Sequence, residues 1–450
     1  MFRFCLVFAV AAGMLFRFCL YGFLKNQQYY DPFLILAFRQ KDLSFAMIGI
    51  LIGFREICIN LMEIPAGAVA DVLGRRRSMI ASFLAYIGSF IVFGAYVGSL
   101  TIFGLSVPFW MLFAAMFLFA VGEAFRTGTH KAIIFDWLER QGRVSEKTSV
   151  YGRTRSWSKL GSAVSVVIAT GLVFSTEQYW AVFLVCIIPY SMNVVNFLTY
   201  PSYLDGPRQR EEHSGGLVRT VFSAVGQSLR HRPLRRLLIE SMGYEGLYKS
   251  CKDYVQPVIK AACLSLPVMA ALADRRQWAE SQQVAIAVGA VYFVLYLLGS
   301  FASRGAGSFA KGSGGEDRAA RVLWLSDLTA FTLMAAGIYA GLFYPGLAVL
   351  SIVAFVLLAV FQNLWRPILI GRVASHADSD QMGTILSIES QAKSLFVAII
   401  APLLGWSVDL ITRYDEGLRF MPIAVLGIAV SAVILLIGPR SDSVPATIPE

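Results

Sequence analysis

Four basic side chains lie inside long apolar stretches of the sequence: Lys25, Arg126, Lys249 and Arg366. An ionisable group in the middle of a bilayer costs about 2.5–3.5 kcal/mol on insertion scales, so such groups are usually paired or functional. Basic groups in an apolar setting attract anions, and the planar guanidinium of arginine matches a carboxylate or a phosphate. The chemistry that these residues indicate is therefore the binding of a small anion.

Polar residues recur three or four positions away from these cations, which places them on the same helical faces. We predict that the following residues bind substrate together with the four cations: Gln28, Tyr29, His130, Asp253 and Asn363. Pairing inside one helix is the alternative, because Asp253 follows Lys249 at this spacing. Glu123 precedes Arg126 in the same way. His130 either relays protons, since histidine titrates near physiological pH, or is simply hydrogen-bonded.

Carboxyl groups inside apolar stretches could carry a coupling proton, because an apolar setting favours their protonated form. The candidates are Asp31, Glu56, Glu63 and Glu123, and Asp136 and Glu245 share the pattern. Asp136 lies near the end of its stretch, where a gate or cap role is favoured. The sequence does not choose among these carboxyl groups, and a sodium ion is the alternative coupling ion.

The composition of the chain indicates that these residues are carried by helices that lie in a membrane. The chain of 450 residues is 56% apolar and 15% charged, with a mean hydropathy of +0.62, which excludes a soluble globular protein. Apolar runs of about 20 residues recur along the chain, and each can cross a bilayer as a helix. We predict an all-α integral membrane protein with twelve transmembrane helices over residues 15–38, 44–66, 79–99, 108–137, 155–175, 178–199, 236–263, 283–303, 322–342, 346–372, 385–410 and 421–438.

The net charge of +10 is concentrated in alternate short connections, as the positive-inside rule predicts, and so does not indicate nucleic-acid binding. The opposite connections, around residues 100–107, 176 and 343, carry no lysine or arginine. We therefore expect a multi-pass protein of the cell membrane with both termini in the cytoplasm. The six cysteines and four histidines show no disulfide pattern and no metal-ligand spacing, so we predict no cofactor and no metal.

Two halves of the chain resemble each other, which indicates an internal duplication. Gly22-Phe-Leu-Lys25 matches Gly246-Leu-Tyr-Lys249, and Lys159 matches Lys393 at a similar offset. A polar connection rich in glycine, proline and arginine separates the halves. We predict an N-terminal six-helix bundle at 1–200, a cytoplasmic linker at 201–235, a pseudo-symmetric C-terminal six-helix bundle at 236–440 and a flexible tail at 441–450.

The segment from Gly67 to Arg77 reads Gly-Ala-Val-Ala-Asp-Val-Leu-Gly-Arg-Arg-Arg. It resembles the loop between helices 2 and 3 of the major facilitator superfamily of transporters, except that Val72 stands where a basic residue is usual. The resemblance implies a fold whose first, fourth, seventh and tenth helices line a central cavity. Because these helices carry the four cations, the cavity would be electropositive.

The resemblance also implies a gate at this loop. We predict that Gly67, Asp71, Gly74 and Arg75 act in gating, with Asp71 paired to a charged partner or helix end and Arg75 to an acidic group. Further gate or interface residues are predicted on the fifth and eleventh helices: Arg155, Lys159, Glu389 and Lys393.

The function implied is secondary active transport of a small solute, an organic or inorganic anion, by alternating access in the lipid bilayer. We expect a monomer. The alternative is a proton-coupled multidrug or toxic-compound exporter of the same superfamily. Such exporters commonly have a glycine-proline run in the fifth helix, whereas the segment from Gly161 to Gly171 has no proline. A membrane-embedded enzyme or a receptor is the remote alternative, since His130 and Asp136 are one residue too far apart for an acyltransferase motif.

Overall fold

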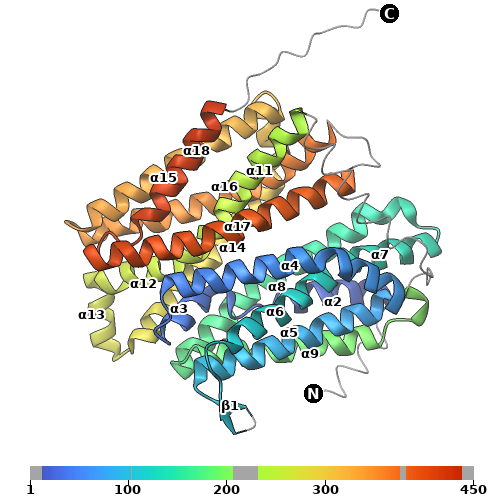
Figure 1. Cartoon of the computed structure of the whole chain (residues 1–450), viewed down its shortest axis with the longest axis horizontal. Helices are drawn as coiled ribbons and strands as arrows, with labels where there is room; N and C mark the ends of the chain where they lie inside the picture. Colours follow the sequence, from blue (N-terminus) through green and yellow to red (C-terminus); the bar gives the residue numbers. More distant parts are fainter. Residues whose placement is uncertain (1–12, 103, 206–231, 376–381, 438–450) are drawn as a thin grey trace, which may run out of the picture. The chain divides into compact units, whose positions relative to one another are not determined.

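The computed structural model describes residues 13–102, 104–205, 232–375 and 382–437, and this part of the chain is almost entirely helical (Figure 1). Its single described hairpin joins β1 (Thr101–Ile102) and β2 (Leu105–Ser106) in antiparallel register. The α-helices are α2 (Met14–Lys25), α3 (Leu34–Arg39), α4 (Phe45–Leu73), α5 (Arg75–Gly98), α6 (Met111–Arg126), α7 (Thr129–Arg140), α8 (Lys147–Thr176), α9 (Trp180–Leu198), α11 (Arg232–Cys251), α12 (Val255–Ser265), α13 (Pro267–Arg276), α14 (Glu280–Gly312), α15 (Glu316–Gly341), α16 (Val349–Ala374), α17 (Met382–Tyr414) and α18 (Met421–Ile437). Short 3₁₀ turns η1 (Asp31–Phe33), η2 (Val144–Glu146), η3 (Ser202–Asp205), η4 (Lys252–Tyr254) and η5 (Pro345–Ala348) connect some of them.

The helices confirm the prediction of an all-α membrane protein. Among the described residues, nine helices are long and apolar enough to cross a membrane. Leu234–Ser265 and Pro267–Arg276, bent by 76° at their junction, make a tenth if they form one span. The other two predicted spans, 15–38 and 421–438, correspond to the interrupted pair α2–α3 and to α18, which has only 17 residues.

The chain divides into two compact units. Within the described residues, the first comprises Met1–Arg219, Asp253–Leu297 and Val397–Asp409, and the second comprises Thr220–Lys252, Leu298–Phe396 and Leu410–Glu450. In the first unit, α5 packs against α6 and α9, and α2 packs against α8. In the second unit, α15 packs against α16 and α18. The bundle boundaries predicted at residues 200 and 235 stay a prediction.

The first predicted span is interrupted directly after Lys25. Residues 26–30 are not helical, and the chain continues through η1 into α3. The side-chain amide of Asn26 donates to the carbonyl of Gly22 at 2.7 Å, and that of Gln27 donates to the carbonyl of Gly161 at 3.1 Å. The hydroxyl of Tyr190 donates to the carbonyl of Lys25 at 3.2 Å. Non-helical backbone at membrane depth needs such partners, and it usually lines a cavity.

The corresponding helix of the second half has a similar interruption. After Lys249, α11 ends at Cys251, η4 follows, and α12 begins at Val255. Each interruption therefore comes within a few residues of the lysine of the Gly-x-x-Lys match. The internal repeat inferred from the sequence thus has a counterpart in the secondary structure.

Two glycines bring α2 close to α8. A Cβ atom on Gly161 would lie 2.5 Å from the carbonyl oxygen of Phe23, and one on Gly22 would lie 2.8 Å from that of Thr154. Real Cβ atoms do not approach so closely, and small residues at these positions let the two backbones approach in the way that membrane helices favour. The contact places the polar residues of α8 beside Lys25.

Candidate functional site

A cavity of about 350 Å³ opens in the first unit, beside the interruption after Lys25. Five of its fifteen lining residues are cations: Lys25 of α2, Arg126 of α6, Lys131 of α7, and Arg155 and Lys159 of α8. None of the described lining residues is an aspartate or a glutamate. The walls therefore carry an excess of positive charge.

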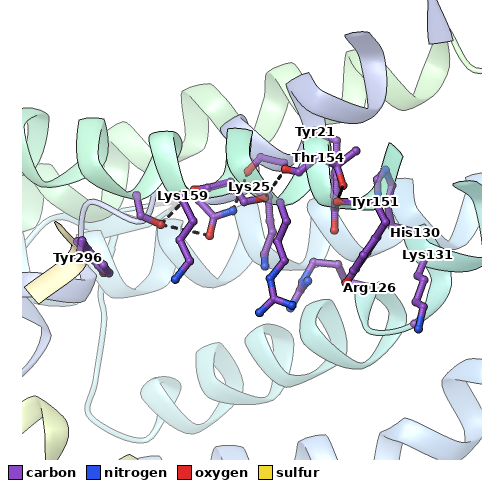
Figure 2. Close-up of a pocket in the computed structure, with 15 residues that line it drawn as sticks. Tyr21, Lys25, Arg126, His130, Lys131, Tyr151, Thr154, Lys159 and Tyr296 are labelled. Carbon is purple, nitrogen blue, oxygen red and sulfur yellow. Dashed lines mark hydrogen bonds between the residues drawn. The ribbon is translucent and has the colours of Figure 1, made fainter. Parts of the chain in front are cut away.

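The cavity brings together residues that the sequence predicted separately. Lys25, Arg126 and His130, predicted to bind substrate, share it with Arg155 and Lys159, predicted as gate residues. Figure 2 shows Lys25 and Lys159 between Tyr296, at one end of the view, and Lys131, at the other. Of the four cations that the sequence singled out inside apolar stretches, Lys25 and Arg126 line this cavity, and their role in binding a substrate stays a prediction.

Three residues of the first unit that were predicted to bind substrate do not line the cavity. Gln28 is half-buried in the interruption, and Tyr29 is buried there with 6% of its surface exposed. Asp253 is buried in η4. Their contact with a substrate stays a prediction.

The cations of the cavity differ in their partners. The guanidinium of Arg126 forms an ion pair with Glu123, and its Nε donates to the hydroxyl of Tyr86 at 3.3 Å. Tyr86 in turn donates to Glu123. By contrast, in the described part of the chain no carboxylate lies within 4 Å of Lys25 or Lys159. Arg126 is therefore held in place by its partners, and the excess positive charge comes from the other cations of the lining, Lys25 and Lys159 among them.

His130 closes one wall of the cavity. Its ring stacks on that of Tyr21, with centroids 3.7 Å apart and planes inclined by 29°, and the edge of Phe18 packs against it. The side chain is buried, and its Nε2 has no hydrogen-bond partner among the described residues. His130 thus contributes a buried aromatic wall beside the cations of the cavity.

A stripe of hydroxyl groups completes the lining and was not predicted. Thr154, Ser158 and Ser162 lie four residues apart on α8 and so share one face, and they line the cavity together with Lys159. Ser162 donates to the side-chain oxygen of Asn26 at 3.5 Å. The spacing of these hydroxyls is visible in the sequence, but it does not show whether they face a cavity or bond back to their own helix.

The second unit holds a balanced network of charges instead. Nη1 of Arg366 lies 3.0 Å from Oε1 of Glu245 and 2.8 Å from Oε2 of Glu389. Nζ of Lys393 lies 2.8 Å from Oε2 of Glu245 and 3.4 Å from Oε1 of Glu389. Ser241 also donates to Glu389. Two cations face two carboxylates. Glu389 and Lys393 are neighbours on one helix, whereas Arg366 pairs with carboxylates of two other helices, which the sequence did not predict.

Two other predicted residues also belong to the second unit. Asn363 donates to the carbonyl of Ala359 in its own helix at 2.8 Å. Lys249 is half-buried near the end of α11. A joint role of Lys249 and Lys25 in binding one substrate stays a prediction.

The sequence model described as the Major Facilitator Superfamily matches residues 6–402. The chain belongs to this superfamily. It is thus a multi-pass membrane transporter, and not an enzyme. No curated protein matches the chain in sequence.

Solved structures of transporters share the fold of this superfamily member. A mutant of the nucleoside transporter NupG aligns with a TM-score of 0.70 at 13% identity, over 97% of this chain and 98% of that one. A POT family transporter in complex with 5-aminolevulinic acid aligns with a TM-score of 0.67 at 15% identity, over 94% of this chain and 96% of that one. A D-xylose–proton symporter aligns with a TM-score of 0.62 at 11% identity, over 97% of this chain and 99% of that one. At these identities the likeness shows the fold alone.

In the superfamily loop between α4 and α5, Asp205 from further along the chain contacts Gly74 and Arg76. Gly74 has a φ of +99°, and a Cβ there would lie 2.9 Å from the side chain of Asp205. Asp205 accepts a hydrogen bond from the backbone of Arg76 at 3.2 Å and lies 3.7 Å from its Nε. The prediction was an acidic partner for Arg75. Among the described residues, the acidic group at this loop contacts Arg76 instead. The side chain of Asp71 lies outside the described residues.

The candidate coupling carboxylates of the first unit are in contact with polar groups. Glu56 is buried and lies 3.1 Å from Nη2 of Arg55. Asp31 accepts a hydrogen bond from Tyr296 at 2.8 Å. Glu123 is held by Arg126 and Tyr86, and Glu63 is half-buried in α4. Their roles in coupling stay predictions.

Removing one carboxylate of the network in the second unit should destabilise the protein. In Glu389→Gln, Arg366 and Lys393 would share Glu245 alone, and breaking a buried ion pair costs about 3–5 kcal/mol. Because Arg366 is 34% exposed, we expect a value near the lower end, about 3 kcal/mol, measured as a lower melting temperature of the purified protein.

The control is Glu416→Gln, which removes the same charge from a side chain that is 78% exposed and paired with Arg419. An exposed pair contributes about 0–1 kcal/mol. Equal melting temperatures for the two variants would contradict the structural role of the network.

Proposed function

We propose that this chain is a secondary active transporter of a small organic or inorganic anion, which it moves by alternating access. The observation that carries the proposal is the lining of the cavity, with five cations and no carboxylate among the described lining residues. Membership of the superfamily supports transport by alternating access, and the positive charge of the cavity supports selection of an anion.

The charge of the cavity favours an anion for a physical reason. Lys25 and Lys159 are partly withdrawn from water, and in the described residues neither has a carboxylate within 4 Å, so neither forms an ion pair there. A carboxylate or phosphate between them would supply a counter-ion. The hydroxyls of Thr154, Ser158 and Ser162 offer further hydrogen bonds. A volume of about 350 Å³ lies at the small end of the range for ligand pockets.

The same lining disfavours the exporter alternative. A cationic drug would approach five positive groups and would find no acidic side chain among the described lining residues. Among the solved structures that share the fold, one holds 5-aminolevulinic acid, a molecule with a carboxyl group. A solute with this chemistry would suit the cavity of the present chain.

The remaining parts of the proposal follow the superfamily. The coupling ion is a proton or a sodium ion, and the candidate coupling groups are Asp31, Glu56, Glu63 and Glu123. Movement of the α4–α5 loop, with Gly67, Asp71, Gly74 and Arg75, would gate the cavity. We propose that the transporter works as a monomer in the cell membrane.

Loss of either cavity lysine should weaken anion binding. Lys25→Gln and Lys159→Gln each remove one charged donor, and a hydrogen bond to a charged group contributes about 1.5–3 kcal/mol. We expect affinity to fall about tenfold to a hundredfold. The measurement is the thermal shift of the purified protein with succinate, benzoate and glycerol 3-phosphate, using whichever acid stabilises the parent protein most.

The matched control is Lys311→Gln, which removes the same charge from an exposed position on α14. It should bind the acid as the parent does. If the cavity variants also bind as the parent does, the two lysines are structural and the proposal of an anion loses its main support.

The distribution of basic residues predicts the orientation in the membrane. Residue 312 follows Arg304 and Lys311, whereas residue 104 lies in a connection without lysine or arginine. In a cysteine-free protein, a membrane-impermeant thiol reagent added to intact cells should label a cysteine at 104 and not one at 312. The opposite pattern would place the termini outside the cell.

A further inference from the structure

A buried acid in the second unit has no part in the site described above. Asp327 lies in the middle of α15, with 3% of its surface exposed. The hydroxyl of Tyr244, on α11, donates a hydrogen bond to its Oδ1 at 3.0 Å. Asp327 lies inside the predicted span 322–342 and is not among the coupling carboxyl groups predicted from the sequence.

Aromatic rings enclose this pair. The ring of Tyr244 stacks on that of Trp365, with centroids 4.1 Å apart and planes inclined by 8°. Trp324, one turn before Asp327 on α15, packs edge-on against Tyr244 at 4.9 Å and against Trp365 at 5.9 Å. Both tryptophans are fully buried, so the carboxyl group of Asp327 lies in an apolar setting.

The other buried carboxylates of this unit have a different environment. Glu240 is paired with Arg236 and Arg372. Glu245 and Glu389 are each paired with Arg366 and Lys393. Each of the three therefore has two cations, whereas no cation of the described residues lies within 4 Å of Asp327.

The elements packed around Asp327 offer no further counter-charge. The helix α18 has no ionisable residue. The two arginines of α16 are both engaged, Arg366 with Glu245 and Glu389, and Arg372 with Glu240 and Asp317. From α11, the hydroxyl of Tyr244 donates to Asp327, and the buried Glu240 and Glu245 of the same helix are each paired with two cations.

We propose that Asp327 is a proton-binding site of the transporter. An ionised carboxylate in an apolar setting without a cation is costly, and a neutral acid avoids most of this cost. The proton comes from water and forms an O–H bond on the carboxyl group, while Tyr244 donates to Oδ1. The proton returns to water when the aromatic cluster opens, and the carboxylate that remains is then solvated.

The position of the site suggests what the proton does. Tyr244 and Glu245 are neighbours on α11, so the segment that contacts Asp327 also carries one carboxylate of the charge network. On α16, Trp365, which stacks on Tyr244, is the neighbour of Arg366, which belongs to the charge network. A negative charge on Asp327 would favour displacement of these segments, which links protonation to the arrangement of the network. This inference does not rest on the anion proposal, since it concerns a different group of residues.

The test is infrared spectroscopy of the purified full chain in buffers from acidic to strongly alkaline. A protonated carboxyl group has a C=O stretch that the carboxylate lacks. We expect the wild-type protein to show such a band at neutral pH and to lose it in alkaline buffer. The band should be missing from Asp327→Asn, which keeps the shape of the neutral acid and should fold.

The matched control is Asp317→Asn on the same helix, because Asp317 is 64% exposed and paired with Arg372. It should keep the band. Tyr244→Phe removes the hydrogen bond and should shift the frequency of the band without abolishing it. A band that survives in Asp327→Asn, one that is absent from the wild type at neutral pH, or one that does not respond to alkaline buffer would each overturn the proposal.

Discussion

The cost of a charge away from water determines where the ionisable residues of this chain lie. In the second unit, Arg366 and Lys393 face Glu245 and Glu389, so the charges balance within the protein. In the first unit, Arg126 has Glu123, but the lysines Lys25 and Lys159 of the same cavity have no carboxylate within 4 Å in the described residues. The charges of the second unit balance within the protein, whereas in our proposal a solute of opposite charge balances those of the first.

The backbone of the first unit places Lys25 and Lys159 in the lining of one cavity. The helix that carries Lys25 ends there, and the amide of Asn26 and the hydroxyl of Tyr190 donate to carbonyl groups of its last turn. Gly22 and Gly161 let α2 approach α8 closely, which brings Lys159 and the hydroxyl stripe to the same cavity. The packing that stabilises the unit thus also positions the proposed binding groups.

Much of this arrangement could be predicted from local sequence patterns. Apolar runs predicted the membrane helices, and the position of Lys25 and Arg126 inside such runs singled out two of the cations that line one cavity. Arg155 and Lys159, which also line it, were predicted as gate residues. Such patterns depend on neighbours along one helix, so they do not require knowledge of the fold. Other features depended on tertiary contacts. The pair of Arg366 and Glu245 joins residues 121 positions apart, and no periodicity reports a contact of that kind. Hydroxyls in a membrane helix often bond back to their own helix, as Ser158 does to the carbonyl of Thr154, so their role in the cavity was hidden.

The selectivity of the wild-type cavity for charge is the most direct test of this account. Calorimetric titration would compare carboxylic acids with their neutral amides, such as succinate with succinamide and benzoate with benzamide, at low and at high salt. The account predicts that acids bind, that the amide of the same shape binds far more weakly, and that salt weakens binding of the acid. Amides that bind as tightly as their acids, with no effect of salt, would contradict it.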